Sequence, residues 1–425
     1  MTTKEMIEKL KNGGLTAYAS LYGADKEEET ARYLHAVEEF TAEYGESEEL
    51  YLFSVPGRTE VLGNHTDHNR GEVLAAAVDR DVIAVVSPCP GEIRVKSEGY
   101  PEDVVALDKT ETPGAYPAFS SASLIAGMAG GFRNRGLKTG GFRAFTTSRV
   151  LKGSGLSSSA AFEVMIGNIL NHLYSGGEVP NEEIAKIARY AENAYFGKPC
   201  GLMDQMACAV GGFVHIDFAD PDFPKIDPIS FSLSDKGFVL CIVNTGGNHA
   251  DLNADYASVP AEMKAVAAYF GKEVLREVTE KEVLENLPVL RKTAGDRAVM
   301  RAFHFFRENE RVKEAAEALK TGKTEAFLRL VTESGSSSFR FLQNVYTNQN
   351  VAEQGISLAL AVTEGLLKDK GCAYRVHGGG FAGTMQAFVR KDLAEDYRRA
   401  MDAVFGDGAC MTLFIRNEGA VRISL

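Results

Sequence analysis

The residues best suited to chemistry lie in a glycine- and serine-rich run that follows a predicted strand and opens a predicted helix. The run consists of Gly153, Ser154, Gly155, Leu156, Ser157, Ser158 and Ser159. Glycines let the backbone approach a ligand closely, and serines at a helix start present N–H groups at the positive end of the helix dipole. This pattern favours phosphate binding. A capped helix after a glycine turn, with no ligand, is the alternative interpretation.

Two acidic residues accompany this run. Asp204 is a lone carboxylate in an apolar, glycine-flanked segment at residues 200–212, and buried acids are rare unless they are paired or functional. Glu192 precedes it, near the end of a predicted helix. Two acids near a phosphate-binding loop suit Mg-assisted phosphoryl transfer, in which one acid holds the metal and the other lies beside the attacking hydroxyl.

A polar stretch between two predicted strands contains Asn64, His65, Asp67, His68 and Asn69. Paired donors and acceptors of this kind suit a polyhydroxylated ligand. A metal site formed by His65, Asp67 and His68 is a weaker alternative, because no further ligand pattern accompanies them. A solvated polar turn is the third interpretation.

A second glycine cluster, at residues 378–383, formally matches G-x-G-x-x-G. In a dinucleotide-binding fold this fingerprint opens a helix. Here residues 384–389 predict a strand, so we reject that interpretation. A hairpin turn with close backbone packing is the favoured interpretation, and a functional glycine turn is the alternative.

The elements that must position these residues are strands and helices in mixed order. Strand-like runs occupy residues 51–55, 73–78, 82–86, 92–96 and 142–148. Helices are predicted over residues 120–136, 157–173, 182–196 and in several segments between 258 and 370. The absence of regular strand–helix–strand alternation favours an α+β fold in two domains. A Pro-containing stretch at 219–228 gives expected domains at 1–222 and 223–425.

The composition is that of an ordinary globular protein, with 45% hydrophobic and 24% charged residues. The net charge of −12 argues against nucleic acid as a partner. The six cysteines form no C-x-x-C motif, so we expect neither a disulfide framework nor a zinc site. No apolar run reaches the roughly 20 residues of a membrane span. The N-terminus lacks the apolar core of a signal peptide, and we expect a cytoplasmic protein without membrane association.

Four motifs resemble, in order, those of the GHMP small-molecule kinases and, within them, the galactokinase family. Residues 57–69 look like the signature G-R-x-N-x-I-G-E-H-T-D-Y-N, and residues 153–160 resemble the ATP loop P-x-G-x-G-L-S-S-S-A. Residues 200–205 resemble C-G-I-M-D-Q, and residues 378–383 resemble G-G-G-F-G-G. The resemblance implies a two-domain α+β kinase fold, with the active site in the cleft between the domains, that uses ATP and Mg²⁺.

The resemblance also implies roles for the residues that match these motifs. Asp204 would orient or deprotonate the C1 hydroxyl of a sugar, and Arg58 would lie beside Asp204 and stabilise the negative charge that develops during transfer. Ser159 and Glu192 would hold Mg²⁺, while residues 153–159 would surround the phosphates of ATP.

In the same way the resemblance implies a sugar site. Asn64, His65 and Asp67 would hydrogen-bond sugar hydroxyls. Tyr256 resembles the tyrosine of the family's S-E-Y-N segment and would line the sugar pocket. Gly380 would help to close the site near the substrate.

The departures from the family pattern fall mainly in the sugar motifs. Asn64 stands where the family has Glu, His68 where it has Tyr, and Thr59-Glu60 where it has V-N. Leu151 replaces the Pro before the ATP loop. A carboxylate only accepts hydrogen bonds, whereas an amide also donates them, so the matching hydroxyl pattern differs.

The leading hypothesis is therefore an Mg-ATP-dependent sugar 1-kinase acting on D-galactose. A kinase of the same fold for a different sugar is the nearest alternative. A non-catalytic regulator that binds sugar and nucleotide is a third, which the retention of Arg58, Ser159, Glu192 and Asp204 disfavours. The expected partners are a small sugar and ATP, and the sequence does not decide between a monomer and a weak homodimer.

Overall fold

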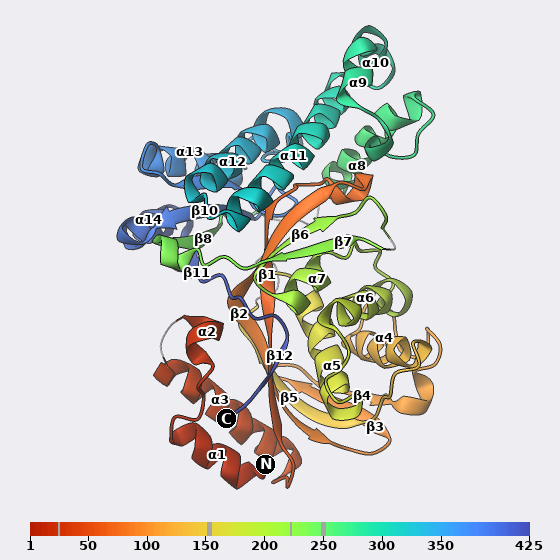
Figure 1. Ribbon diagram of the computed structural model, residues 1–425, viewed down its shortest axis with the longest axis vertical. Helices are drawn as coiled ribbons and strands as arrows, with labels where there is room; N and C mark the ends of the chain where they lie inside the picture. Colours follow the sequence, from red (N-terminus) through yellow and green to blue (C-terminus); the bar gives the residue numbers. More distant parts are fainter. Residues whose placement is uncertain (24–25, 151–154, 222, 248–251) are drawn as a thin grey trace.

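The computed structural model describes residues 1–23, 26–150, 155–221, 223–247 and 252–425. It combines two β-sheets with helices on their faces, as the α+β prediction requires (Figure 1). The two chain ends lie near each other (Figure 1): Lys9 Nζ donates to the Leu425 carbonyl at 3.1 Å, and β12 (Val421–Ile423) pairs with β1 (Tyr51–Leu62).

The larger sheet has the strand order β12-β1-β2-β5-β3-β4, and a β6-β7 hairpin pairs with the first part of β2. Its other strands are β2 (Glu72–Pro88), β3 (Glu92–Ser97), β4 (Glu102–Ala106), β5 (Phe142–Ser148), β6 (Phe213–Asp217) and β7 (Lys225–Ile229). The sequence predicted two short strands where β2 is one strand of 17 residues. The acids between them are tolerated because each has a partner: Asp81 Oδ1 lies 2.6 Å from Arg32 Nη1, and Asp79 Oδ1 accepts the Phe414 amide at 3.1 Å.

Helices cover both faces of this sheet (Figure 1). Alternate residues of β2 point to opposite faces, so Ile83 and Val85 pack with the N-terminal helices, while Val82, Ala84 and Val86 pack on the other side. The N-terminal helices are α1 (Thr3–Lys11), α2 (Tyr18–Tyr22) and α3 (Lys26–Tyr44). The opposite face carries α4 (Ser121–Asn134), α5 (Ser158–Tyr174), α6 (Asn181–Ala191), the π-helix η3 (Glu192–Phe196) and α7 (Met203–Val210).

The smaller sheet has the order β11-β8-β10-β9. Its strands are β8 (Phe238–Asn244), β9 (Ala373–Val376), β10 (Thr384–Arg390) and β11 (Cys410–Leu413). The second glycine cluster forms the turn between β9 and β10, as predicted. The remaining helices are α8 (Asn253–Tyr269), α9 (Glu280–Glu285), α10 (Leu287–Thr293), α11 (Asp296–Lys320), α12 (Thr324–Ser337), the π-helix η6 (Ser338–Leu342), α13 (Gly355–Leu367) and α14 (Lys391–Phe405).

The Pro-containing stretch chosen as the domain boundary includes a strand. Residues 225–229 form β7, which pairs with β6 of the larger sheet. Pro228 is tolerated there because β7 pairs on one side with β6 and lies at the sheet edge. The division at 222/223 stays a prediction, and the larger sheet takes strands from both sides of it.

All six cysteines are free thiols. Among the described residues, the helices are all too short or too polar to traverse a lipid bilayer.

Candidate active site

Arg58 and Asp204 form an ion pair that joins the 57–69 and 200–205 motifs, which lie far apart in the sequence. Arg58 lies on β1, and Asp204 lies in the first turn of α7. Arg58 Nε donates to Asp204 Oδ1 at 2.8 Å, and its Nη1 donates to the Gly155 carbonyl at 2.6 Å. Ser157 Oγ donates to Asp204 Oδ2 at 2.5 Å. One guanidinium therefore joins the acid to the serine-rich loop.

The Asp204 carboxylate stays ionised at neutral pH. Desolvation opposes its charge, but the charge and hydrogen bond of Arg58 outweigh that effect and hold the pKa of Asp204 below its ordinary value. Its side chain keeps 37% of its surface accessible, while that of Arg58 keeps 10%. The pair thus presents a fixed carboxylate to a ligand on its open side.

The serine-rich loop leads into α5, which begins at Ser158. Ser157 precedes it with φ +60°, and the Ser157 hydroxyl bonds Asp204 instead of capping the helix. Within the described ranges no side chain caps α5, which corrects our expectation of a serine cap. Its first N–H groups therefore remain available to an anion. Gly153 and Ser154 lie outside the described residues.

The two glycine clusters of the sequence meet at Gly155. Gly155 has φ +76°, and a Cβ there would lie 3.0 Å from the His377 ring and 3.2 Å from Thr384 Oγ1. Burial lowers the pKa of His377 to about 3, so its imidazole is neutral. The β9–β10 turn therefore packs directly on the serine-rich loop, which explains why a glycine is required there.

Behind the loop lies a buried acidic cluster. Gln205 Nε2 donates to Glu192 Oε2 at 2.7 Å and to Glu163 Oε2 at 3.2 Å, and Lys198 Nζ lies 3.2 Å from Glu192 Oε1. Burial and the neighbouring Glu192 raise the pKa of Glu163 well above its ordinary value. Sequence reasoning missed Glu163, although it follows Ser159 by one helical turn and so shares its face of α5.

The 64–69 stretch turns sharply at His65, which has φ +61°. Its Nε2 lies 2.8 Å from the Gly379 carbonyl, and burial lowers its pKa, so a neutral His65 donates that hydrogen bond. Asp67 approaches the segment before Asp204, because a Cβ on Gly201 would lie 3.3 Å from Asp67 Oδ2. The alternative metal site at this stretch lacks support: among the described residues, the structure forms no group of three or more His, Cys, Asp or Glu suited to a metal ion.

Tyr256 and Gly380 meet on the other side of this stretch. Tyr256 Oη donates to the Gly380 carbonyl at 2.8 Å, and its ring packs edge-on against Phe381 at 5.3 Å between centroids. Gly380 has φ +82°, and a Cβ there would lie 1.9 Å from the Asn344 carbonyl oxygen. Only glycine fits at this position.

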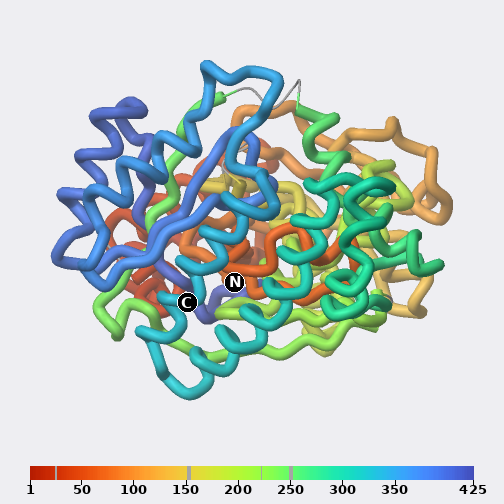
Figure 2. Tube along the Cα trace, turned by 90° about the horizontal axis from the view of Figure 1, so that it is seen from above, coloured from red at the N-terminus to blue at the C-terminus, as the bar shows by residue number. Residues whose placement is uncertain are grey.

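Helix α11 holds the 63–72 segment from the second half of the chain. His304 Nε2 lies 3.0 Å from the Asn64 carbonyl, and Glu308 Oε1 accepts the Gly63 amide at 3.1 Å. Burial lowers the pKa of His304 to about 4. In Figure 2 the orange chain of this segment lies beside the teal helices that include α11. Sequence reasoning missed these contacts; polar residues spaced three and four apart on α11 were the available signal.

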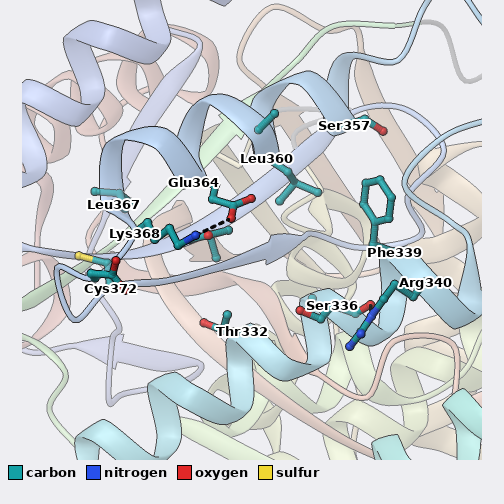
Figure 3. Close-up of a pocket in the computed structure, with 14 residues that line it drawn as sticks. Thr332, Ser336, Phe339, Arg340, Ser357, Leu360, Glu364, Leu367, Lys368 and Cys372 are labelled. Carbon is teal, nitrogen blue, oxygen red and sulfur yellow. Dashed lines mark hydrogen bonds and ion pairs between the residues drawn. The ribbon is translucent and has the colours of Figure 1, made fainter.

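A separate hollow of about 630 Å³ lies between α12 and α13 beside β9 (Figure 3). Its lining includes Phe339, Leu360 and the Glu364–Lys368 pair. None of the described residues that line this hollow was predicted from the sequence to bind a ligand or act in catalysis. The candidate active site is therefore defined by the contacts between motifs and not by this hollow.

Comparisons with known proteins identify the family. Residues 120–212 match the GHMP kinases N terminal domain, and residues 38–88 match the galactokinase galactose-binding signature. The chain is 32% identical over 353 residues to the galactokinase of Thermotoga neapolitana, covering 83% of this chain and 93% of that protein.

This chain belongs to the galactokinase family. A further member, the galactokinase of Thermotoga maritima, is 32% identical over 361 residues, covering 82% of this chain and 95% of its own. The galactokinase of Lactococcus lactis, solved with galactose, superposes with a TM-score of 0.75 at 22% identity, over 92% of this chain and 99% of that one. The Methanococcus jannaschii mevalonate kinase gives a TM-score of 0.61 at 14% identity, over 87% and 99%. The protein is thus a sugar kinase with the two-domain GHMP kinase fold.

Proposed function

We propose that this protein transfers the γ-phosphoryl group of Mg-ATP to the C1 hydroxyl of D-galactose. The observation that carries the proposal is the Arg58–Asp204 pair, which is tied through Gly155 and Ser157 to the start of α5. The names of the Thermotoga relatives and the galactose in the Lactococcus structure support the choice of sugar.

In this mechanism Asp204 accepts a hydrogen bond from the C1 hydroxyl and aims that oxygen at the γ-phosphorus. The new O–P bond forms as the bond to the β-phosphate oxygen breaks, and the hydroxyl proton passes to Asp204 as ADP leaves. Arg58 stabilises the negative charge that develops on the transferring group. The N–H groups at the start of α5 and residues 153–159 would bind the phosphates.

Mg²⁺ fits the acidic cluster behind the loop. Glu163 Oε1 is buried and accepts no hydrogen bond within the described residues, so this cluster has an unused oxygen. Ser159 and Glu192 would hold the ion, with Glu163 beside them, and these hydroxyl and carboxylate oxygens are the ligands Mg²⁺ prefers. When bound, the ion would neutralise charge on the phosphate oxygens.

The same proposal places the sugar between two parts of the chain. His65, Asp67, Tyr256 and Gly380 would line its site, with the buried Asn64 supporting it from behind, between an N-terminal unit at 1–222 and a C-terminal unit at 223–425. A kinase for another sugar is the second candidate, favoured by Asn64 and His68, which depart from the family signature. We also propose that the protein acts in the cytoplasm.

A sugar panel with Mg-ATP, scored by ADP release, tests the proposal. We expect D-galactose to give the highest kcat/KM, with no comparable ADP release when sugar is left out. Turnover of another hexose without turnover of galactose would select the second candidate. Sugar binding without any ADP release would leave only a binding protein.

A further inference from the structure

Two of the departures from the family signature are reciprocal. The signature has Asn and Glu where this chain has Glu60 and Asn64, respectively. In the structure these two side chains touch, because Asn64 Nδ2 donates to Glu60 Oε1 at 2.8 Å. The chain therefore still has one carboxylate and one amide at these two positions, but in exchanged order.

The Asn64 amide is used on the protein itself. Its second Nδ2 hydrogen goes to the Gly378 carbonyl at 2.7 Å, and its Oδ1 accepts from Asn344 Nδ2 at 2.6 Å. Asn64 is fully buried. Both of its donors are thereby engaged, so this side chain acts as a brace between β1 and the β9–β10 turn.

The Glu60 carboxylate is engaged through one oxygen. Its Oε1 accepts from Asn64 and lies 3.6 Å from Arg375 Nη1. Its Oε2 accepts no hydrogen bond from the described part of the chain. This oxygen is not completely covered by protein, so a ligand can reach it. Only 9% of the Glu60 side chain is accessible. A carboxyl oxygen so nearly buried favours a hydrogen-bond partner from a ligand.

Glu60 also faces the active site. The pairing of β1 with β2 is regular from Arg58 to Glu60, with Arg58 opposite Ala77 and Glu60 opposite Ala75. Residues two apart on a strand point to the same face, so Glu60 lies on the face that holds Arg58 and its partner Asp204. Glu60 therefore lies on the sheet face where the proposed sugar would bind.

We infer that Glu60 accepts a hydrogen bond from a hydroxyl of the sugar and selects among sugars, with Asn64 as the residue that positions it. This inference rests on the proposed function. It assigns the carboxylate that contacts the sugar to position 60, and it explains why position 64 carries an amide.

The first test compares Glu60→Gln with wild type. The glutamine has one oxygen and one N–H₂ group in place of the two carboxylate oxygens. When its oxygen stays with Asn64, the N–H₂ group stands at the position of Oε2 and cannot accept a hydrogen bond from the sugar. At about pH 8, above the pKa of Glu60, we expect kcat/KM for the sugar to fall about tenfold to a hundredfold, as for a lost hydrogen bond to a charged group, while the KM for ATP is unchanged. Glu98→Gln is the matched control, because Glu98 is half exposed and pairs with His35; it should behave as wild type.

The second test uses the reciprocal exchange. Asn64→Glu alone places two carboxylates in contact and removes the donor to Gly378, so we expect a large loss of activity and of thermal stability. Adding Glu60→Asn should restore activity at least tenfold above the product of the two single effects, because contacting residues couple. If the two single effects simply multiply, the side chains at positions 60 and 64 do not act together, and the inference is wrong.

Wild type is measured first, which separates the two failures. If wild type turns over no sugar, the proposed function fails. If wild type turns over sugar and Glu60→Gln retains its kcat/KM and its sugar profile, the inference fails while the proposed function stands. A folded Glu60→Gln with a raised sugar KM and an altered sugar profile supports the inference.

Discussion

The side chains that hydrogen-bond Asp204 come from the first half of the chain, whereas the region around Asn64 is held by side chains from both halves. Arg58, Ser157 and Asp204 contact one another directly. Asn64 and Gly63 instead depend on His304, Glu308 and Asn344. The phosphate-binding region is therefore described by short motifs, and the sugar-binding region needs long-range contacts before its residues can be interpreted.

Asp204→Asn should have the largest effect, because it removes the Arg58–Asp204 ion pair of the first region. The amide cannot accept the hydroxyl proton, and it loses the charged partner of Arg58. We expect kcat to fall about 10²- to 10⁴-fold, with nucleotide binding largely retained. Steady-state kinetics with calorimetric titration of nucleotide checks this, and near-normal turnover would remove Asp204 from the mechanism.

Gly380→Ala should disturb the packing of the second region by steric overlap. The new Cβ would collide with the Asn344 carbonyl in addition to the left-handed strain of about 1–2 kcal/mol at φ +82°. We expect a lower Tm and a raised sugar KM, with less change in the KM for ATP. Gly91→Ala is the control, because Gly91 has φ +85° but its Cβ would meet open space in the described part of the chain. Equal effects of the two variants would contradict close packing at Gly380.

These two sites also show what the sequence alone could predict. The serine-rich run, Arg58 and Asp204 were readable because each lies in a compact motif with a distinct chemistry. The brace at Asn64 was not, because its partner His304 is 240 positions away and Asn344 is 280 positions away. The single long β2 was missed for a similar reason: Asp81 is buried only because Arg32 and Arg416 reach it from distant segments.

Tyr256→Phe is a smaller change in the second region, and it tests to which of the two regions Tyr256 belongs. Removing the hydroxyl leaves the Gly380 carbonyl without this donor and costs about 0.5–1.5 kcal/mol. We expect the sugar KM to rise by up to about tenfold, and the KM for ATP to stay within error. An effect confined to ATP would show that Tyr256 belongs with the phosphate-binding region.

The pH dependence of stability tests the second region through Glu60 alone. Burial raises the pKa of Glu60 to about 7, although Arg375 and Arg58 oppose it. An unfolded glutamate ionises near about 4.3, so between these values the folded chain binds a proton that the unfolded chain does not. The free energy of unfolding of wild type should therefore fall as pH rises through this window, relative to Glu60→Gln. Thermal melts of both proteins at about pH 5 and pH 8 measure this difference; a difference that does not change with pH would contradict the raised pKa.

The identity of the phosphorylated oxygen shows directly whether Asp204 orients the C1 hydroxyl of galactose toward ATP. Wild type, D-galactose and Mg-ATP are incubated together, and the product is examined by phosphorus NMR with detection of coupling to sugar protons. We expect one sugar phosphate whose phosphorus couples to the anomeric proton, formed in equal amount to ADP and strongly reduced in Asp204→Asn. A phosphorus signal coupled to the C6 protons, or ADP release without any sugar phosphate, would contradict this expectation.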